Sequence, residues 1–105
     1  MNQEEFAKVF DATLTSCEKL LVVKGGEYAG VEDRLGNFKR GAALTGTTPL
    51  QVAFIYASKH YDSIASFVRD PKRVGSEPIE GRFDDLINYC ILMKAIVKEG
   101  LGERP

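Results

Sequence analysis

The chain has 105 residues, of which 44% are hydrophobic and 28% charged, a composition typical of a folded protein. The length fits one domain spanning residues 1–105 and excludes a second. The net charge of -1 excludes the basic excess that binding to duplex DNA or RNA requires. Because a chain this short buries only about two thirds of its unfolded surface, we expect further burial between subunits, and hence a homo-oligomer.

Residues 3–23 carry apolar side chains at spacings of three and four, which predicts a helix with one buried stripe. The helix is expected to end at Lys24-Gly25-Gly26, where a cation is followed by glycine. The stripe consists of Phe6, Val9, Phe10, Leu14, Cys17, Leu20 and Leu21.

Residues 25–46 are rich in glycine and either form a functional loop or contain a short helix. A helix within residues 32–43 would turn Leu35, Phe38 and Ala42 inward, although Gly36 and Gly41 weaken it.

The segment Thr48-Pro49-Leu50-Gln51 predicts the start of a second helix, with threonine as N-cap, proline in the first turn and glutamine completing a capping box. This helix is expected to end before Pro71. Its predicted buried stripe is Leu50, Ala53, Phe54, Ala57, Tyr61, Ile64, Phe67 and Val68.

After a connection over residues 71–79, a third helix is predicted over residues 80–99, with Gly100 as its stop and residues 100–105 as a frayed tail. Its predicted inward residues are Phe83, Leu86, Ile87, Cys90, Ile91, Met93 and Val97. No alternating stretch indicates a strand. The predicted fold is therefore all-α: a small bundle of three long helices, with a short helix in the glycine-rich connection left open, and a core over residues 3–99.

Cys17 and Cys90 both lie in predicted apolar stripes, which favours two reduced, buried thiols over a disulfide or a metal site. The longest apolar runs have four residues, at 20–23 and 90–93, and the chain begins with polar side chains. We therefore expect no membrane span, no signal peptide and a cytoplasmic location.

The glycine-rich segment combines groups that suit a nucleotide. Lys24, Arg34, Lys39 and Arg40 are candidate phosphate-binding cations. The rings of Tyr28 and Phe38 are faces on which a base could stack. The alternative is a solvated loop with two aromatic anchors in the core.

In the third helix, Asp84 and Asn88 share one side at the edge of the stripe, whereas Asp85 and Tyr89 are predicted to point the other way. An acid and an amide so placed either contact a metal, base or ribose, or form a structural hydrogen-bonded pair, with Arg34 or Lys59 as a further partner.

In the second helix, Lys59 shares a polar strip with Ser63 and Ser66 and is the stronger candidate for ligand binding. His60 is interpreted as a surface or packed histidine rather than a catalytic one. Arg82 belongs to a group of cations, with Arg69, Lys72 and Arg73, that either bind an anion or form a solvated surface offset by nearby acids.

Four stretches carry a resemblance: Lys24-Gly-Gly-Glu-Tyr28, Arg34-Leu-Gly-Asn-Phe-Lys39, Lys59-His-Tyr-Asp-Ser-Ile64 and Gly81-Arg-Phe-Asp-Asp-Leu-Ile-Asn-Tyr89. Over residues 20–97 the chain resembles small phage and prophage proteins of the nucleotide-modification-associated type, which are distantly similar to all-α NTP pyrophosphohydrolases of the MazG-like and dimeric dUTPase group. The part that matches best is Arg-x-x-Asp-x-x-Asn-Tyr, from Arg82 to Tyr89. The resemblance implies a helical oligomer and a nucleotide-like ligand in a groove lined by Tyr28, Asn37, Lys59, Asp84 and Asn88.

The chain departs from the pyrophosphohydrolases in its acids. Those enzymes hold Mg²⁺ with acid pairs on facing helices, whereas here the second helix has no acid between Pro49 and Tyr61 and presents Lys59. A protonated lysine binds phosphate but cannot ligate magnesium. The third helix supplies Glu80 and Asp84, one acid pair at most.

These observations favour a phage-type cytoplasmic protein that binds and sequesters a phosphate-bearing nucleotide or a nucleotide-derived signal, without cofactor or catalysis, to counter host immune signalling. The predicted ligand-binding residues are Lys24, Tyr28, Arg34, Asn37, Phe38, Lys59, Ser63, Arg82, Asp84 and Asn88. One alternative is a Mg²⁺-dependent nucleotide pyrophosphohydrolase in which Glu27, Glu32 or Asp33 complete a metal site begun by Glu80 and Asp84. Another is an inhibitor that binds a host protein directly.

Overall fold

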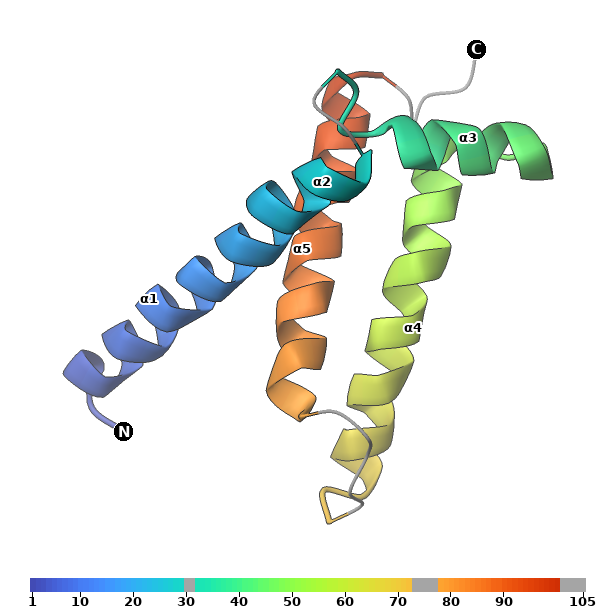
Figure 1. Cartoon of the computed structure of the whole chain (residues 1–105). Helices are drawn as coiled ribbons and strands as arrows, with labels where there is room; N and C mark the ends of the chain where they lie inside the picture. Colours follow the sequence, from blue (N-terminus) through green and yellow to red (C-terminus); the bar gives the residue numbers. More distant parts are fainter. Residues whose placement is uncertain (30–31, 73–77, 101–105) are drawn as a thin grey trace. The chain divides into compact units, whose positions relative to one another are not determined.

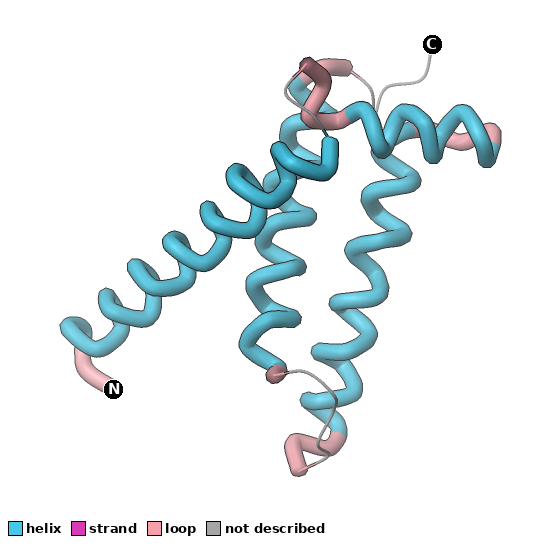
Figure 2. The backbone as a smooth tube through the Cα atoms, in the orientation of Figure 1, coloured by secondary structure: helices cyan, strands magenta, loops and turns pink. Residues whose placement is uncertain are grey.

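The computed structural model of the chain describes residues 1–29, 32–72 and 78–100, and all the regular elements within these ranges are helices (Figures 1 and 2). The all-α prediction is confirmed for this part of the chain. The predicted frayed tail over residues 101–105 lies outside the described residues. Contacts between residues divide the chain into two compact units, Met1–Arg34 and Leu35–Pro105.

The N-terminal unit contains one continuous helical run, made of α1 (Gln3–Glu18), the π-helical segment η1 (Lys19–Lys24) and α2 (Gly25–Ala29). Asn2 caps its start by accepting a hydrogen bond from the backbone N–H of Glu5 at 2.8 Å. With this run counted as one helix, the described residues form four helices, and α3 is the short fourth one.

The predicted helix end at Lys24-Gly25-Gly26 is wrong, because Gly25 keeps right-handed helical angles (φ -61°, ψ -36°). The Nη2 of Arg34 donates a hydrogen bond to the carbonyl of Leu21 at 2.9 Å. A Cβ at Gly25 would collide with this guanidinium. Glycine is therefore needed here to leave room for Arg34, not to end the helix.

The stripe predicted to be buried along the first helix is mostly exposed. Cys17 is buried as predicted, whereas Phe6, Val9, Phe10, Leu14 and Leu20 are exposed. The reason lies within the unit: its described residues form a single helical run, so they provide no second helix against which the stripe could pack.

The C-terminal unit contains α3 (Gly36–Thr45), α4 (Pro49–Arg69) and α5 (Ile79–Lys98). Helices α4 and α5 lie side by side and antiparallel, and α3 crosses the first turns of α4 (Figure 1). Helix α3 is the short helix left open by the sequence, and Leu35, Phe38 and Ala42 are buried as expected. A Cβ at Gly41 would lie 3.1 Å from Cγ1 of Val52, so glycine permits the close approach of α3 to α4.

The predicted start of α4 is confirmed. The Thr48 hydroxyl accepts from the backbone N–H of Gln51 at 3.1 Å, and the Gln51 side chain accepts from the backbone N–H of Thr48 at 2.9 Å. This reciprocal capping box leaves few unpaired donors at the helix start. The helix ends at Arg69, before Pro71 as predicted.

We call the facing positions of α4 and α5 the seam, since they recur at spacings of three and four and are buried or half-buried. The seam consists of Ala53, Ala57, His60, Ile64 and Phe67 on α4, and of Arg82, Asp85, Tyr89, Leu92 and Ile96 on α5. With Leu35, Phe38, Ala42 and Val52, its residues Ala53 and Ile96 form the buried core of the unit.

The predicted buried face of α5 is wrong at five of its seven residues, whereas Leu86 and Met93 are half-buried and Met93 packs against the core. Phe83, Ile87, Cys90, Ile91 and Val97 are exposed, while Asn88 and Ile96 are the buried residues of the helix. Asp85 and Tyr89, which we expected to point away, lie in the seam. On α4 the seam residues Ala53 and Ala57 are buried as predicted, whereas Phe54, Tyr61 and Val68 are exposed.

The two sides of the seam differ in chemistry. In an antiparallel pair of helices, the residues one position earlier in the sequence than the seam residues lie on the same side of the pair in both helices. The residues one position later in the sequence lie on the other side. The side before the seam, here called the polar flank, carries Tyr56, Lys59, Ser63, Asp84 and Asn88, with the apolar Val52 and Ile91 at the end nearer α3. The side after it, the apolar flank, carries Phe54, Tyr61, Val68, Phe83, Leu86, Cys90, Met93 and Val97.

Candidate binding site on the α4–α5 pair

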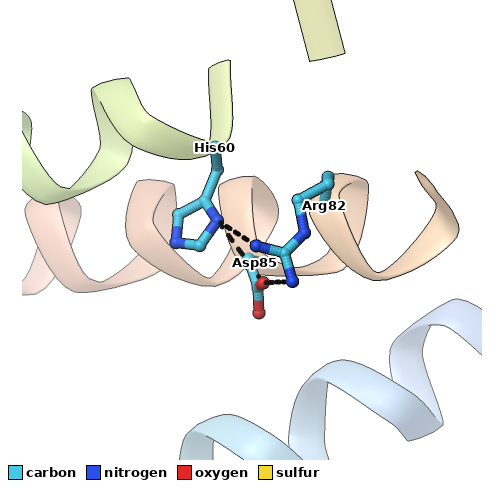
Figure 3. Close-up of polar contacts among 3 residues, drawn as sticks. All are labelled: His60, Arg82 and Asp85. Carbon is cyan, nitrogen blue, oxygen red and sulfur yellow. Dashed lines mark hydrogen bonds and ion pairs between the residues drawn. The ribbon is translucent and has the colours of Figure 1, made fainter. Parts of the chain in front are cut away.

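A polar cluster of three side chains occupies the seam, with His60 from α4 facing Arg82 and Asp85 from α5 (Figure 3). The Oδ2 of Asp85 lies 3.4 Å from Nδ1 of His60 and 3.5 Å from Nη2 of Arg82. The Nη1 of Arg82 lies 3.4 Å from Nδ1 of His60. All three side chains are largely buried, so each contact is screened less than a surface pair would be.

The cluster has two hydrogen-bonding arrangements, and the proton on His60 selects between them. With Nδ1 unprotonated, the imidazole accepts a hydrogen bond from Nη1 of Arg82, and the guanidinium also pairs with Asp85. In the tautomer that carries hydrogen on Nδ1, the ring instead donates to Oδ2 of Asp85.

Aromatic rings surround the polar cluster. The His60 ring stacks on Tyr89 with centroids 5.3 Å apart and an interplanar angle of 27°. Tyr89 and Tyr56 meet edge to face at 6.4 Å, and Phe38 contacts both at 6.4 and 6.5 Å. Such tilted pairs add attraction beyond the burial of apolar area and hold the His60 ring in place.

Tyr89 shows the electrostatic character of the seam. Burial raises the pKa of its phenol above the ordinary value of 10.0, and the charge of Asp85 and the phenol of Tyr56 raise it further. Both effects disfavour the phenolate, so Tyr89 is a neutral hydroxyl group that can donate a hydrogen bond at physiological pH.

Lys59 lies on the polar flank beside the aromatic cluster. Its Nζ is 5.6 Å from the centroid of the Tyr56 ring, a cation–π contact. Its side chain is exposed. Ser63, one helical turn further along α4, is exposed on the same flank. An anion that enters along this flank would meet the ammonium of Lys59 before the guanidinium in the seam.

Asn88 is the buried polar residue of this flank. It is 7% exposed, and within the described part of the chain its Oδ1 accepts no hydrogen bond. A buried acceptor without a donor costs about 1–3 kcal/mol. The position of Asn88 next to Tyr89 makes this oxygen a candidate acceptor for an N–H group of a ligand.

The structure thus brings four predicted site residues, Lys59, Ser63, Asp84 and Asn88, to the polar flank, with Arg82 in the adjoining seam. The remaining predicted residues lie elsewhere. Asn37 is exposed in the first turn of α3. Phe38 is 2% exposed and lies in the core, where its ring contacts the rings of Tyr56 and Tyr89.

The other predicted site residues belong to the N-terminal unit. Lys24 is exposed at the end of η1. The Arg34 side chain donates a hydrogen bond to the Leu21 carbonyl. Tyr28 lies in α2, and its side chain is outside the part that the structure describes.

The acids named for the metal alternative fall in different units: Glu27, Glu32 and Asp33 in the first, Glu80 and Asp84 in the second. Among the described residues, no three His, Cys, Asp or Glu side chains are grouped closely enough to hold a metal ion. None of the helices described is long and apolar enough to span a membrane.

Four residues of the polar cluster and of the aromatic rings beside it were not predicted as site residues from the sequence: Tyr56, His60, Asp85 and Tyr89. Their signal was present as spacing. Tyr56 and His60 are four apart on α4, and Arg82, Asp85 and Tyr89 are three and four apart on α5, so each set shares one helix face. The apolar stripe of α5 gave a stronger periodic signal, so Phe83 and Ile87 were predicted to face inward in place of Asp85 and Tyr89.

Comparisons of this chain with protein-family models, with curated proteins and with solved structures find no match.

Proposed function

We propose that the polar flank and the adjoining seam bind a phosphate-bearing nucleotide, or a signalling molecule derived from one, without hydrolysing it. The observation that carries the proposal is the meeting of cations, aromatic rings and a buried amide on one side of the α4–α5 pair. A nucleotide needs this combination: positive charge for phosphate, a ring face for the base and a directional hydrogen bond for its edge.

The phosphate would be held by Lys59, with His60 and Arg82 behind it. Lys59 is exposed, and within the described residues no carboxylate forms an ion pair with it. Arg82 shares its charge with Asp85, so a phosphate would compete with that carboxylate for the guanidinium.

The base would be recognised by Tyr56 and Asn88. The Tyr56 ring is 41% exposed and already fixed by contacts with Phe38 and Tyr89, so stacking a base on its free surface costs little conformational entropy. The orphaned Oδ1 of Asn88 accepts an N–H of the base edge.

Binding without turnover follows from the type of residue at the site. A magnesium-dependent hydrolase needs several carboxylate oxygens around the phosphate. Here the flank offers one carboxylate, Asp84 on α5, and the cation Lys59 on α4, whose ammonium can bind phosphate but cannot ligate magnesium. One biological use of such a protein is the sequestration of a nucleotide messenger in host immune signalling, as expected for a phage-type protein.

Calorimetric titration of the full-length chain tests the proposal directly. The panel consists of nucleoside mono-, di- and triphosphates, cyclic mono- and dinucleotides and ADP-ribose, each with and without Mg²⁺. We expect one of these classes to bind with a Kd of about micromolar or tighter, near 8 kcal/mol. Chromatography of the ligand after incubation should recover it intact. Binding no tighter than about millimolar across the panel would contradict the proposal, and recovered hydrolysis products would favour the enzyme alternative.

Lys59→Ala localises the site. Loss of a hydrogen bond to a charged group corresponds to about 1.5–3 kcal/mol, so Kd should rise roughly 10- to 150-fold. Lys98→Ala is the matched control, because it removes the same charge from an exposed position at the far end of α5. Equal loss of affinity in both variants would mean that the ligand responds to net charge and not to this site.

A further inference from the structure

The apolar flank is a second surface with a distinct character. Phe54, Tyr61 and Val68 on α4 are 66%, 62% and 69% exposed, and on α5 Phe83 and Val97 are 43% and 51% exposed. Beside them α5 carries a shallow hollow lined by Phe83, Leu86, Ile87, Cys90, Ile91 and Lys94. The flank is therefore two helices wide, and its large side chains face solvent in the single chain.

The area of this surface lies at the upper end of what a monomer normally exposes in one patch. Large side chains each present about 150–250 Å² when fully accessible, so these exposures leave on the order of 600 Å² of mostly apolar surface. The largest patch on a typical monomer is about 300–600 Å², and a stable interface takes about 800 Å² from each partner. The flank with its bordering side chains approaches the area that a stable dimer needs.

The charge pattern favours a second copy as the occupant. The flank positions themselves are apolar or bear a hydroxyl or thiol group and carry neither acid nor base, while Lys94 lies in the lining of the hollow beside them. At the flank positions, two identical surfaces therefore meet without like charges facing each other. A surface two helices wide is also matched in width by another pair of helices, and two such layers make a four-helix bundle.

We propose that the apolar flank binds the same flank of a second chain, so that two α4–α5 pairs form a four-helix bundle around a twofold axis. This surface shares no residue with the polar flank. The dimer therefore leaves both proposed nucleotide sites accessible and does not depend on them.

Light scattering during size-exclusion chromatography measures the mass of the full chain. The wild type should elute at twice the mass of the chain. The double variant Phe54→Glu/Phe83→Glu should elute as a monomer, since two buried carboxylates per chain would oppose association. Leu44→Glu is the matched control: it makes the same kind of change at an α3 residue that is 87% exposed and outside the flank. It should remain dimeric. A monomeric wild type, or a double variant that stays dimeric, would overturn the proposal.

The thiol of Cys90 supplies an independent readout that needs no substitution. Cys90 is exposed on the flank, whereas Cys17 is buried and should react slowly. Alkylation of Cys90 should slow about tenfold as protein concentration rises until some nine chains in ten are dimeric. In the double variant the rate should not depend on concentration.

A rate independent of concentration in the wild type would contradict the dimer. Circular dichroism confirms that the double variant is folded. Its nucleotide affinity should equal that of the wild type, so failure of the dimer and failure of the nucleotide site are distinguishable.

Discussion

The two faces of α5 do not follow the usual rule that apolar side chains are buried and polar side chains are exposed. The face toward α4 carries Arg82, Asp85 and Tyr89 ahead of Leu92 and Ile96, and it is buried or half-buried. The face away from α4 carries Phe83, Ile87, Cys90 and Ile91, and it is exposed.

The difference shows that a helix face is buried where a complement exists, not where its side chains are most apolar. Helix α4 presents His60 to Asp85 and Arg82, and the Phe38 and Tyr56 rings contact Tyr89. These partners satisfy the polar groups that burial would otherwise penalise. The aliphatic face has no such complement on α4 and is exposed; we propose above that a second chain covers it.

The largest expected effect comes from removing packing at the inner face. Ile96 is fully buried, so Ile96→Ala should lower the free energy of unfolding by about 2–5 kcal/mol. Ile91→Ala removes a similar volume from the outer face, where the side chain is 46% exposed, and should cost less than about 1 kcal/mol in dilute solution. Chemical denaturation below the dimerisation range measures both, and equal losses would mean that the two faces are buried alike.

The next largest effect concerns the polar cluster. Asp85→Asn removes the charge that pairs with both His60 and Arg82, and should cost about 1.5–3 kcal/mol, the value of a hydrogen bond to a charged group. Asp62→Asn makes the same change at an exposed position of α4 and should be nearly neutral. If Asp85→Asn were equally neutral in denaturant titrations, the inner face would owe its burial to the aromatic and aliphatic contacts alone.

The pH dependence of stability separates Tyr89 from exposed tyrosines. The pKa of Tyr89 is raised in the folded state, so the unfolded chain loses the phenol proton at a lower pH than the folded chain does. The free energy of unfolding therefore falls as pH rises above about 10. Tyr89→Phe should abolish this part of the alkaline decline, whereas Tyr61→Phe, at a position 62% exposed, should not.

Asp85→Asn should also bring the pKa of Tyr89 closer to its ordinary value, because it removes one of the charges that raise it. Alkaline titration of tyrosinate absorbance follows this change. A titration curve identical to that of the wild type would show that burial and Tyr56 raise the pKa without a contribution from Asp85.

The smallest expected effect on stability is that of Lys59→Ala. The side chain is exposed and its contact with the Tyr56 ring is worth about 0.5–1 kcal/mol, so the melting temperature without ligand should change little. Stabilisation by added nucleotide should be lost. A destabilisation of several kcal/mol with unchanged affinity would instead show that Lys59 is a structural partner in the pair.

The helices of the C-terminal unit and several of their ends could be predicted from local sequence patterns. The capping box at Thr48 and Gln51, the stop before Pro71 and the inward position of Leu35, Phe38 and Ala42 were all predicted correctly. These features depend on caps, dihedral preferences and spacing within a few residues, which are properties of the local chain.

The buried face of α5 and the role of Gly25 could not be predicted from local patterns, because both depend on contacts between distant residues. Periodicity showed that Phe83, Ile87 and Ile91 share a face, but whether α4 covers that face depends on partners about 25 residues or more away in sequence, such as His60 for Asp85. From the sequence, Gly25 is interpreted as a helix stop, whereas in the structure it leaves room for the Arg34 guanidinium. Burial is decided by non-local complementarity of shape and charge, and that information is absent from any single helix.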